Sequence, residues 1–163
     1  MKTQYYAYLC LTLLLTLGGF NTSWGYYAES NWYTHFTFHF AHASVWHLAG
    51  NALCFYVLTR NRFAWAELAI AYGIATLCSF IAPHALPTVG LSGLIFALYG
   101  MRLTRCRLSG SFIARTALIL LLPLLIGRVN VLLHIFCVLV GYGVALSYYN
   151  LNQTMKDARR FNR

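Results

Sequence analysis

Four polar residues stand where long apolar stretches would otherwise be unbroken: His47, Asn51, Ser92 and His134. His47 and Asn51 are four positions apart, so on a helix they share one face. Ser92 lies in Gly90-Leu91-Ser92-Gly93, at the start of an apolar run. A serine hydroxyl is a weak nucleophile that needs an adjacent base, and histidine can be that base. These residue types therefore could hydrolyse an acyl bond.

Ser92 is also predicted to lie at the N-terminus of a helix. That position offers unpaired backbone N–H groups and the positive end of the helix dipole, and both stabilise a developing oxyanion. The glycines at positions 90 and 93 allow close approach of the backbone. His134 is the only histidine in the last three predicted helices, which makes it the candidate base.

Acidic residues are scarce, because the chain has only Glu29, Glu67 and Asp157. We expect them in a loop, near the inner end of the third predicted helix and in a basic C-terminal tail. A Ser-His-Asp triad is therefore not expected, whereas a Ser-His dyad remains possible. The chain also lacks the HExxH motif of zinc proteases and a pair of membrane aspartates.

The composition points to a membrane protein. Of 163 residues, 60% are hydrophobic and 9% are charged, against about 25% charged in soluble domains. An aromatic fraction of 17% excludes disorder. Six apolar runs predict one all-α domain over residues 1–163, a six-helix polytopic bundle with helices at roughly 5–20, 44–59, 63–82, 91–104, 112–127 and 129–149. The first run resembles a signal peptide, but no A-x-A site follows it, so we expect a retained helix.

Basic residues predict the orientation. Six helices with both termini inside leave eleven of the twelve Lys and Arg residues on the inner side and only Arg128 outside. Positive charge accumulates on the cytoplasmic side of membrane proteins. The inner set is Lys2, Arg60, Arg62, Arg102, Arg105, Arg107, Arg115, Lys156, Arg159, Arg160 and Arg163. The same asymmetry explains the net charge of +9 without a nucleic-acid partner.

The depth of the four polar residues follows from the helix rise of about 1.5 Å per residue. Counted from the arginines at the helix ends, Asn51 and Ser92 lie about 14–15 Å above the inner surface, and His47 and His134 about 20–21 Å. All four therefore fall in one slab of a core about 30 Å thick. Residues 83–89 must then enter the membrane zone as non-helical backbone, which requires a protein-buried or water-filled setting.

Taken together, the polar residues resemble the rhomboid family of intramembrane serine proteases, and the resemblance covers essentially the whole chain. It rests on His42, His47 and Asn51, followed by Gly90-Leu91-Ser92-Gly93 and then His134. The resemblance implies that Ser92 is the nucleophile and His134 the general base. It also implies that His47 and Asn51 help the Ser92 backbone N–H to hold the oxyanion.

Supporting roles are implied for five residues near the site: His42, Gly90, Gly93, Phe96 and Gly141. The resemblance implies that the Phe96 ring packs on His134 and that Gly141 lets the last helix approach the helix of Ser92. The chain departs from the family pattern in three places: Cys137 replaces a frequent glycine, Phe96 a frequent tyrosine, and Trp32-Tyr33 a Trp-Arg pair.

The predicted function is thus an intramembrane serine endopeptidase that cleaves transmembrane segments of other proteins in a lipid bilayer, by a Ser-His dyad. We expect no cofactor, no metal and no nucleic-acid partner. A bacterial cytoplasmic membrane, with the site open to the outside, is the expected location.

The main alternative is a catalytically silent rhomboid-like protein that binds transmembrane helices. A small transporter or channel is disfavoured by the lack of membrane acids and internal repeats. A metal held by His35, His39, His42 and His47 lacks cysteine or carboxylate partners, and a haem between His47 and His134 is a remote alternative. The aromatic cluster at Trp32, Tyr33, Phe36, Phe38 and Phe40 is expected at a membrane interface.

Overall fold

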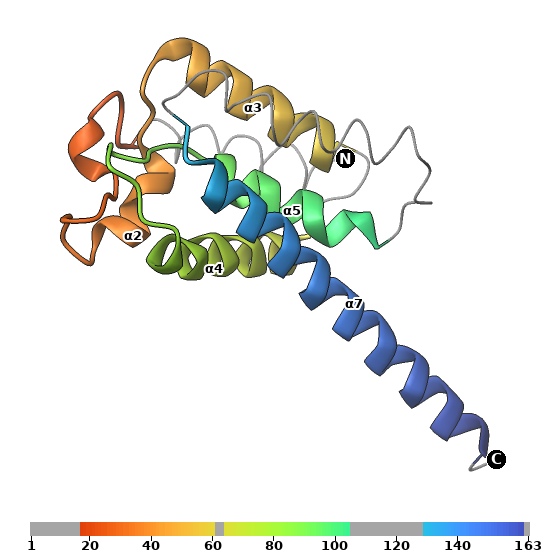
Figure 1. The fold of residues 1–163 in the computed structure, drawn as a ribbon. Coiled ribbons are helices and arrows are strands. Elements are labelled where there is room, and N and C mark those ends of the chain that lie inside the picture. The colour runs from red at the N-terminus through yellow and green to blue at the C-terminus, as the bar shows by residue number, and fades with distance from the viewer. Residues whose placement is uncertain (1–16, 61–63, 105–128, 162–163) are drawn as a thin grey trace.

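The part of the chain that the computed structural model describes is residues 17–60, 64–104 and 129–161, and it is helical, without a β-strand (Figure 1). Three short elements come first: η1 (Thr22–Trp24), α2 (Thr34–Thr37) and η2 (Phe38–Phe40). Four longer helices follow: α3 (Val45–Thr59), α4 (Trp65–Ile81), α5 (Ser92–Leu103) and α7 (Val131–Phe161).

Three of the predicted helices match observed ones closely: 44–59 corresponds to α3, 63–82 to α4 and 91–104 to α5. The end predicted for the span 129–149 was wrong, since α7 continues to Phe161. The apolar run ends near that point, but residues 150–161 contain no glycine or proline, so nothing stops the helix. The predicted spans 5–20 and 112–127 lie outside the described residues, except for 17–20, where residues 18–20 are not helical.

Among the described helices, α7 is the one long and apolar enough to cross a membrane, over Val131–Met155 with a mean hydropathy of 2.0. The apolar helices α3, α4 and α5 are shorter, at 15, 17 and 12 residues. Twelve helical residues extend only about 18 Å. Non-helical backbone over residues 82–91 precedes Ser92, and it includes residues 83–89, which were predicted to be non-helical.

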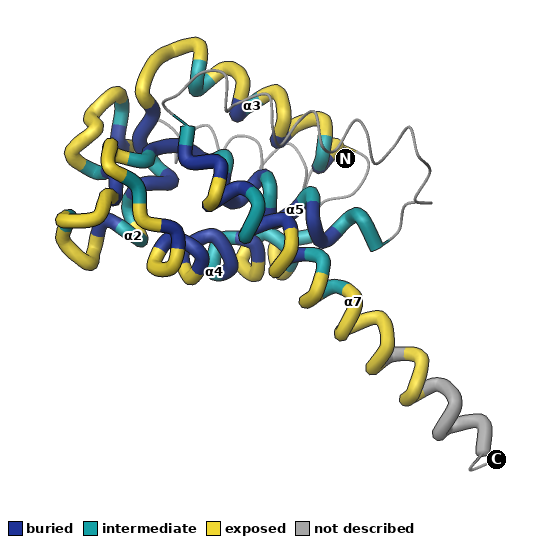
Figure 2. Tube along the Cα trace, in the orientation of Figure 1, coloured by how far each residue is buried: buried dark blue, intermediate teal, exposed yellow. Residues whose placement is uncertain are grey.

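Helix α5 forms the centre of the bundle and packs against α3, α4 and α7 (Figures 1 and 2). Seven of its twelve residues are buried: Gly93, Leu94, Ile95, Ala97, Leu98, Gly100 and Met101. Neighbouring helices cover these residues, as expected of a helix that is apolar on most sides and lies inside a bundle. Ser92, its first residue, is thereby held at the end of the most enclosed element.

Helix α3 packs against this core by one narrow stripe, Asn51, Phe55 and Thr59, spaced four residues apart. Most of its other residues are exposed (Figure 2). The Ser44 hydroxyl accepts a hydrogen bond from the His47 N–H at 3.2 Å and so caps the helix N-terminus. The cap fixes where α3 begins, and hence where His47 and Asn51 lie.

The long segment before α3 holds the loop between α4 and α5 in place. Tyr26 and Thr88 exchange two backbone hydrogen bonds, of 3.2 and 2.8 Å. The Gly90 N–H donates to the Phe38 carbonyl at 2.8 Å. Tyr26 and Phe38 are fully buried, with their rings edge to face at 4.9 Å. The loop that leads to Ser92 is therefore anchored to the core on both sides of Val89.

Candidate active site

Ser92 and His134 come together across the α5–α7 interface, although 42 residues separate them. The Ser92 Oγ lies 3.0 Å from the His134 Nε2, within hydrogen-bond distance. His134 is 4% exposed and Ser92 is half-buried. If His134 is neutral with its proton on Nδ1, Nε2 can accept the serine proton, which is the arrangement that a general base needs.

The ring of Phe96 holds the His134 imidazole in position. The two rings are stacked with centroids 4.2 Å apart and planes 26° apart. Phe96 is one helical turn after Ser92, on the same face of α5. The ring therefore restricts the imidazole to the side on which the hydroxyl lies.

Glycines set how closely α5 and α7 approach. A Cβ at Gly141 would overlap the Ala97 carbonyl and lie 3.1 Å from its carbon. A Cβ at Gly100 would overlap Val138 in the same way. At Gly93 the space is less tight, with Ala75 Cβ at 3.3 Å and Leu133 Cδ2 at 3.4 Å. Gly93 and Gly141 were predicted to lie near the site, whereas Gly100 was not, because its contact with Val138 depends on the tertiary fold.

Gly90 brings the side chains of α3 against the loop that leads to Ser92. Its φ is +112°, which L side chains rarely adopt. A Cβ there would be 2.6 Å from His47 Cε1 and 2.9 Å from both His47 Nε2 and Asn51 Nδ2. The imidazole and the amide thus both lie directly against the Gly90 backbone, two residues before the serine.

Both of these side chains can act as hydrogen-bond donors. The His47 Nδ1 accepts a 3.4 Å hydrogen bond from the Ala43 N–H. A neutral ring therefore carries its proton on Nε2, which is the ring nitrogen nearer Gly90. Asn51 is 7% exposed, and its Nδ2 is buried without a partner among the described residues. A buried amide without a partner costs free energy, which a bound acceptor would recover.

The first turn of α5 supplies further donors. Leu91 precedes the helix and makes no capping hydrogen bond through its side chain. The first N–H groups of a helix have no partner within that helix. A group bound beside Ser92 could thus contact the helix N-terminus, the His47 imidazole and the Asn51 amide together.

His42 lies behind His47, fully buried, with the two ring centroids 5.4 Å apart in an edge-to-face arrangement. Neither ring nitrogen of His42 has a hydrogen-bond partner in the described part of the chain. Burial, and secondarily the nearby His47, lowers the pKa of His42 to about 4. A neutral His42 supports the His47 ring by packing.

A sequence model of the rhomboid domain matches residues 29–151, which include each candidate site residue. The chain belongs to the rhomboid family. Comparison with curated proteins and with solved structures gave no match. Rhomboid proteins are membrane proteins and are generally serine intramembrane proteases. The identification as a rhomboid therefore agrees with the resemblance inferred from the residues.

Two other histidines of this rhomboid, His35 and His39, dock the segment before α3 on α4. His35 Nδ1 lies 2.7 Å from the Ser79 Oγ, and His39 Nε2 lies 3.2 Å from the Thr76 Oγ1. His35 also stacks on Phe80 at 3.9 Å. No group of three or more His, Cys, Asp or Glu residues suited to a metal occurs within the described residues.

The five aromatic rings expected together at a membrane interface differ in their exposure. Trp32, Tyr33 and Phe36 are exposed, whereas Phe38 is fully buried and Phe40 half-buried. The turn η2 directs Phe38 inward against Tyr26. Residue type alone did not separate the exposed rings from the core ring.

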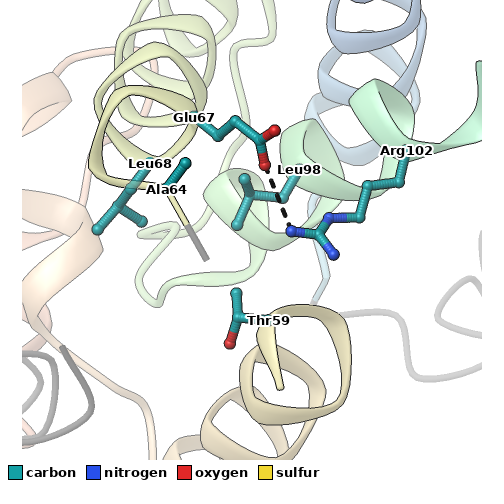
Figure 3. Close-up of a pocket in the computed structure, with 6 residues that line it drawn as sticks. All are labelled: Thr59, Ala64, Glu67, Leu68, Leu98 and Arg102. Carbon is teal, nitrogen blue, oxygen red and sulfur yellow. Dashed lines mark hydrogen bonds and ion pairs between the residues drawn. The ribbon is translucent and has the colours of Figure 1, made fainter. Parts of the chain in front are cut away.

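Glu67 lies away from the Ser92–His134 pair, beside Arg102 near the end of α5. Its carboxylate lies 3.4 Å from the Arg102 guanidinium, and Arg102 also donates to the Leu58 carbonyl. Figure 3 shows both side chains meeting beside a small pocket, which is also lined by Thr59, Ala64, Leu68 and Leu98. Arg102 is ten residues, or about 15 Å of helix, from Ser92, so neither the acid nor this pocket belongs to the serine site.

Sequence reasoning missed a buried polar junction beside the dyad, formed by Tyr26, Thr88 and Asn130. The Asn130 Nδ2 donates to the Tyr26 Oη at 2.9 Å and approaches the Thr88 Oγ1 at 3.4 Å. Asn130 directly precedes an apolar run, which is a helix N-cap signal that could have identified it. Tyr26 and Thr88 carry no such signal, because their pairing depends on the tertiary fold.

Proposed function

We propose that this rhomboid is an intramembrane serine endopeptidase that cleaves transmembrane segments of other membrane proteins. The observation that carries the proposal is the 3.0 Å separation of the Ser92 Oγ and the His134 Nε2, with two potential donors from α3 against Gly90, two residues before the serine. Ser92 is the nucleophile and His134 the general base, without a third acidic partner.

In the first half-reaction the Ser92 Oγ attacks the scissile carbonyl carbon while its proton passes to the His134 Nε2. The C–N bond of the tetrahedral intermediate then breaks, and the imidazolium gives the proton to the leaving amine. The product is an ester between Ser92 and the N-terminal fragment. General acid–base assistance of this kind contributes about 10²–10⁴ in rate.

The negative oxygen of the intermediate is stabilised by the Ser92 N–H, the His47 Nε2–H and the Asn51 Nδ2–H. Removal of one such donor costs about 3 kcal/mol of transition-state stabilisation. The Asn51 Nδ2 has no hydrogen-bond partner among the residues that the structure describes, and it gains an acceptor when the oxyanion forms, which supports this role.

In the second half-reaction a water molecule gives a proton to His134 and attacks the ester, and the serine recovers its proton as the fragment leaves. The half-buried position of Ser92, after a non-helical segment, is consistent with access of water from one side. The substrate must unwind locally, because a helix hides its carbonyl groups in hydrogen bonds. Helix-weakening glycine, proline or small residues near the cleavage site are therefore expected.

The proposal includes six spans with both termini inside, in a bacterial cytoplasmic membrane, with the site open to the outside. The positions of Lys and Arg along the sequence support this orientation.

The test is labelling of the purified protein with a fluorophosphonate probe, which reacts with activated serines. We expect labelling of the wild type and none of Ser92→Ala or His134→Ala. His84→Ala, in the loop between α4 and α5, is the matched histidine control and should label like the wild type. Absence of labelling in the folded wild type, with a known rhomboid labelling in the same detergent, would favour the silent helix-binding alternative.

A further inference from the structure

We propose that Asn130 is a positioning residue for the reaction, which sets the place of His134 relative to Ser92. This inference rests on the proposed function for its catalytic consequence. Asn130 precedes α7 directly, is 4% exposed, and lies one helical turn before His134. It does not touch the reacting atoms, so any effect on catalysis must pass through His134.

The side chain of Asn130 uses both of its polar atoms. Its Oδ1 accepts from the Leu133 N–H at 3.1 Å, which caps the N-terminus of α7. Its Nδ2 donates to the Tyr26 Oη at 2.9 Å and to the Ala82 carbonyl at 3.0 Å. The Tyr26 hydroxyl itself donates to the Ala82 carbonyl at 3.2 Å, which closes a buried triangle.

Three separate parts of the chain meet in this triangle: the segment before α3, the end of α4 and the start of α7. Ala82 and Thr88 bound the loop that leads to Ser92, and Thr88 pairs with the Tyr26 backbone. The same asparagine therefore fixes the loop before the nucleophile and the first turn of the helix that carries the base.

A simple helix cap would not need these contacts. Capping uses only Oδ1, whereas the two Nδ2 hydrogen bonds reach residues 104 and 48 positions away in the sequence. Hydrogen bonds in a buried network reinforce one another. Their loss would free the start of α7 to shift, and a displacement of about 1 Å at a catalytic group costs about 10²-fold in rate.

Asn130→Asp separates the helix cap from the buried network. The carboxylate retains the oxygen that accepts from the Leu133 N–H and lacks the N–H groups that donate to Tyr26 and Ala82. Tyr26→Phe removes one acceptor of the network while Asn130 stays in place, and it serves if Asn130→Asp does not fold. Thr59→Val is the matched control. It deletes a buried hydrogen bond, from the Thr59 hydroxyl to the Phe55 carbonyl at 2.7 Å, near the opposite end of the bundle.

The direct readout is the ring signal of His134 in protein labelled with ¹³C-histidine, assigned by comparison with His134→Ala. Ser92→Ala should shift this signal in the wild-type and Thr59→Val backgrounds, since it removes the hydrogen bond to the imidazole. In the Asn130→Asp or Tyr26→Phe background, the shift caused by Ser92→Ala should fall to less than half of its size in the wild-type background. An equal shift in all backgrounds would overturn the inference, whether or not the protein is a protease.

The kinetic readout is the rate of fluorophosphonate labelling, well below the unfolding temperature of each variant. We expect a loss of at least tenfold for Asn130→Asp and less than threefold for Thr59→Val. Equal losses in both variants would show a general effect of stability and overturn the positioning role. A wild type that does not react with the probe would refute the proposed function, and the histidine signal would still decide the placement of His134.

Discussion

Replacement of Gly90 by alanine tests the geometry of the oxyanion site while both donor side chains stay present. The new Cβ would lie 2.6 Å from His47 Cε1 and 2.9 Å from Asn51 Nδ2, whereas carbon atoms in contact prefer about 3.5–4.0 Å. The imidazole, the amide or the loop must therefore move by about 1 Å. The backbone adds strain, since alanine at the φ of +112° is disfavoured by about 1–3 kcal/mol.

A displacement of about 1 Å in a catalytic constellation lowers the rate by about 10²-fold. We therefore expect Gly90→Ala to lower kcat about 100-fold, equivalent to about 2.7 kcal/mol, and to lower the unfolding free energy by about 1–3 kcal/mol. The assay is cleavage of a transmembrane substrate, or the labelling rate of Ser92, measured where the variant is fully folded.

Gly50→Ala is the matched control, because Gly50 precedes Asn51 on the same helix and a Cβ there meets none of the described residues within 4 Å. It should keep full activity and gain up to about 1 kcal/mol in helix propensity. Activity of folded Gly90→Ala within threefold of the wild type, or an equal loss in Gly50→Ala, would exclude the contact at Gly90 as the feature that places the two donors.

Three further predictions concern the donor set, the helix crossing and pH. Asn51→Ala should lower kcat about 10²–10³-fold with little change in stability; a loss below tenfold would remove the amide from the oxyanion site. Gly141→Ala should destabilise the protein by about 1–3 kcal/mol in a denaturant titration, whereas Gly143→Ala, whose Cβ would meet no described residue within 4 Å, should not. Equal stabilities would contradict the close contact between Gly141 and Ala97. Burial lowers the pKa of His42 from 6.5 to about 4 in the folded protein. As pH falls through this range, His42 therefore becomes protonated in the unfolded chain before it does so in the folded protein. Unfolding free energy should therefore be constant above about pH 6.5 and fall toward pH 4, less steeply in His42→Asn; an equal slope would exclude His42 as the titrating group.

The sequence was most informative where local chemistry is strong. The limits of α3, α4 and α5 were predicted within two residues, because apolar runs were bounded by arginines, prolines and a serine cap. The four polar residues were predicted at one depth, and the structure brings Ser92 to His134 and places His47 and Asn51 against Gly90. The structure thus shows the proximity of these residues, and their common depth in a membrane stays a prediction.

Features that depend on tertiary contacts were not predictable in the same way. The length of α7 was underestimated because a helix can outlast its apolar run. Phe38 was placed with the interfacial aromatic rings, although it packs in the core against Tyr26. The junction at Asn130 was missed because its partners Tyr26 and Ala82 approach it only through folding.

The most direct measurement of the central claim is a crystal structure of the protein after reaction with a fluorophosphonate. We expect a covalent bond from phosphorus to the Ser92 Oγ. We also expect a phosphoryl oxygen about 2.7–3.1 Å from the Ser92 N–H, the His47 Nε2 and the Asn51 Nδ2. Phosphorus bound to another residue, or an oxygen directed away from His47 and Asn51, would contradict this claim.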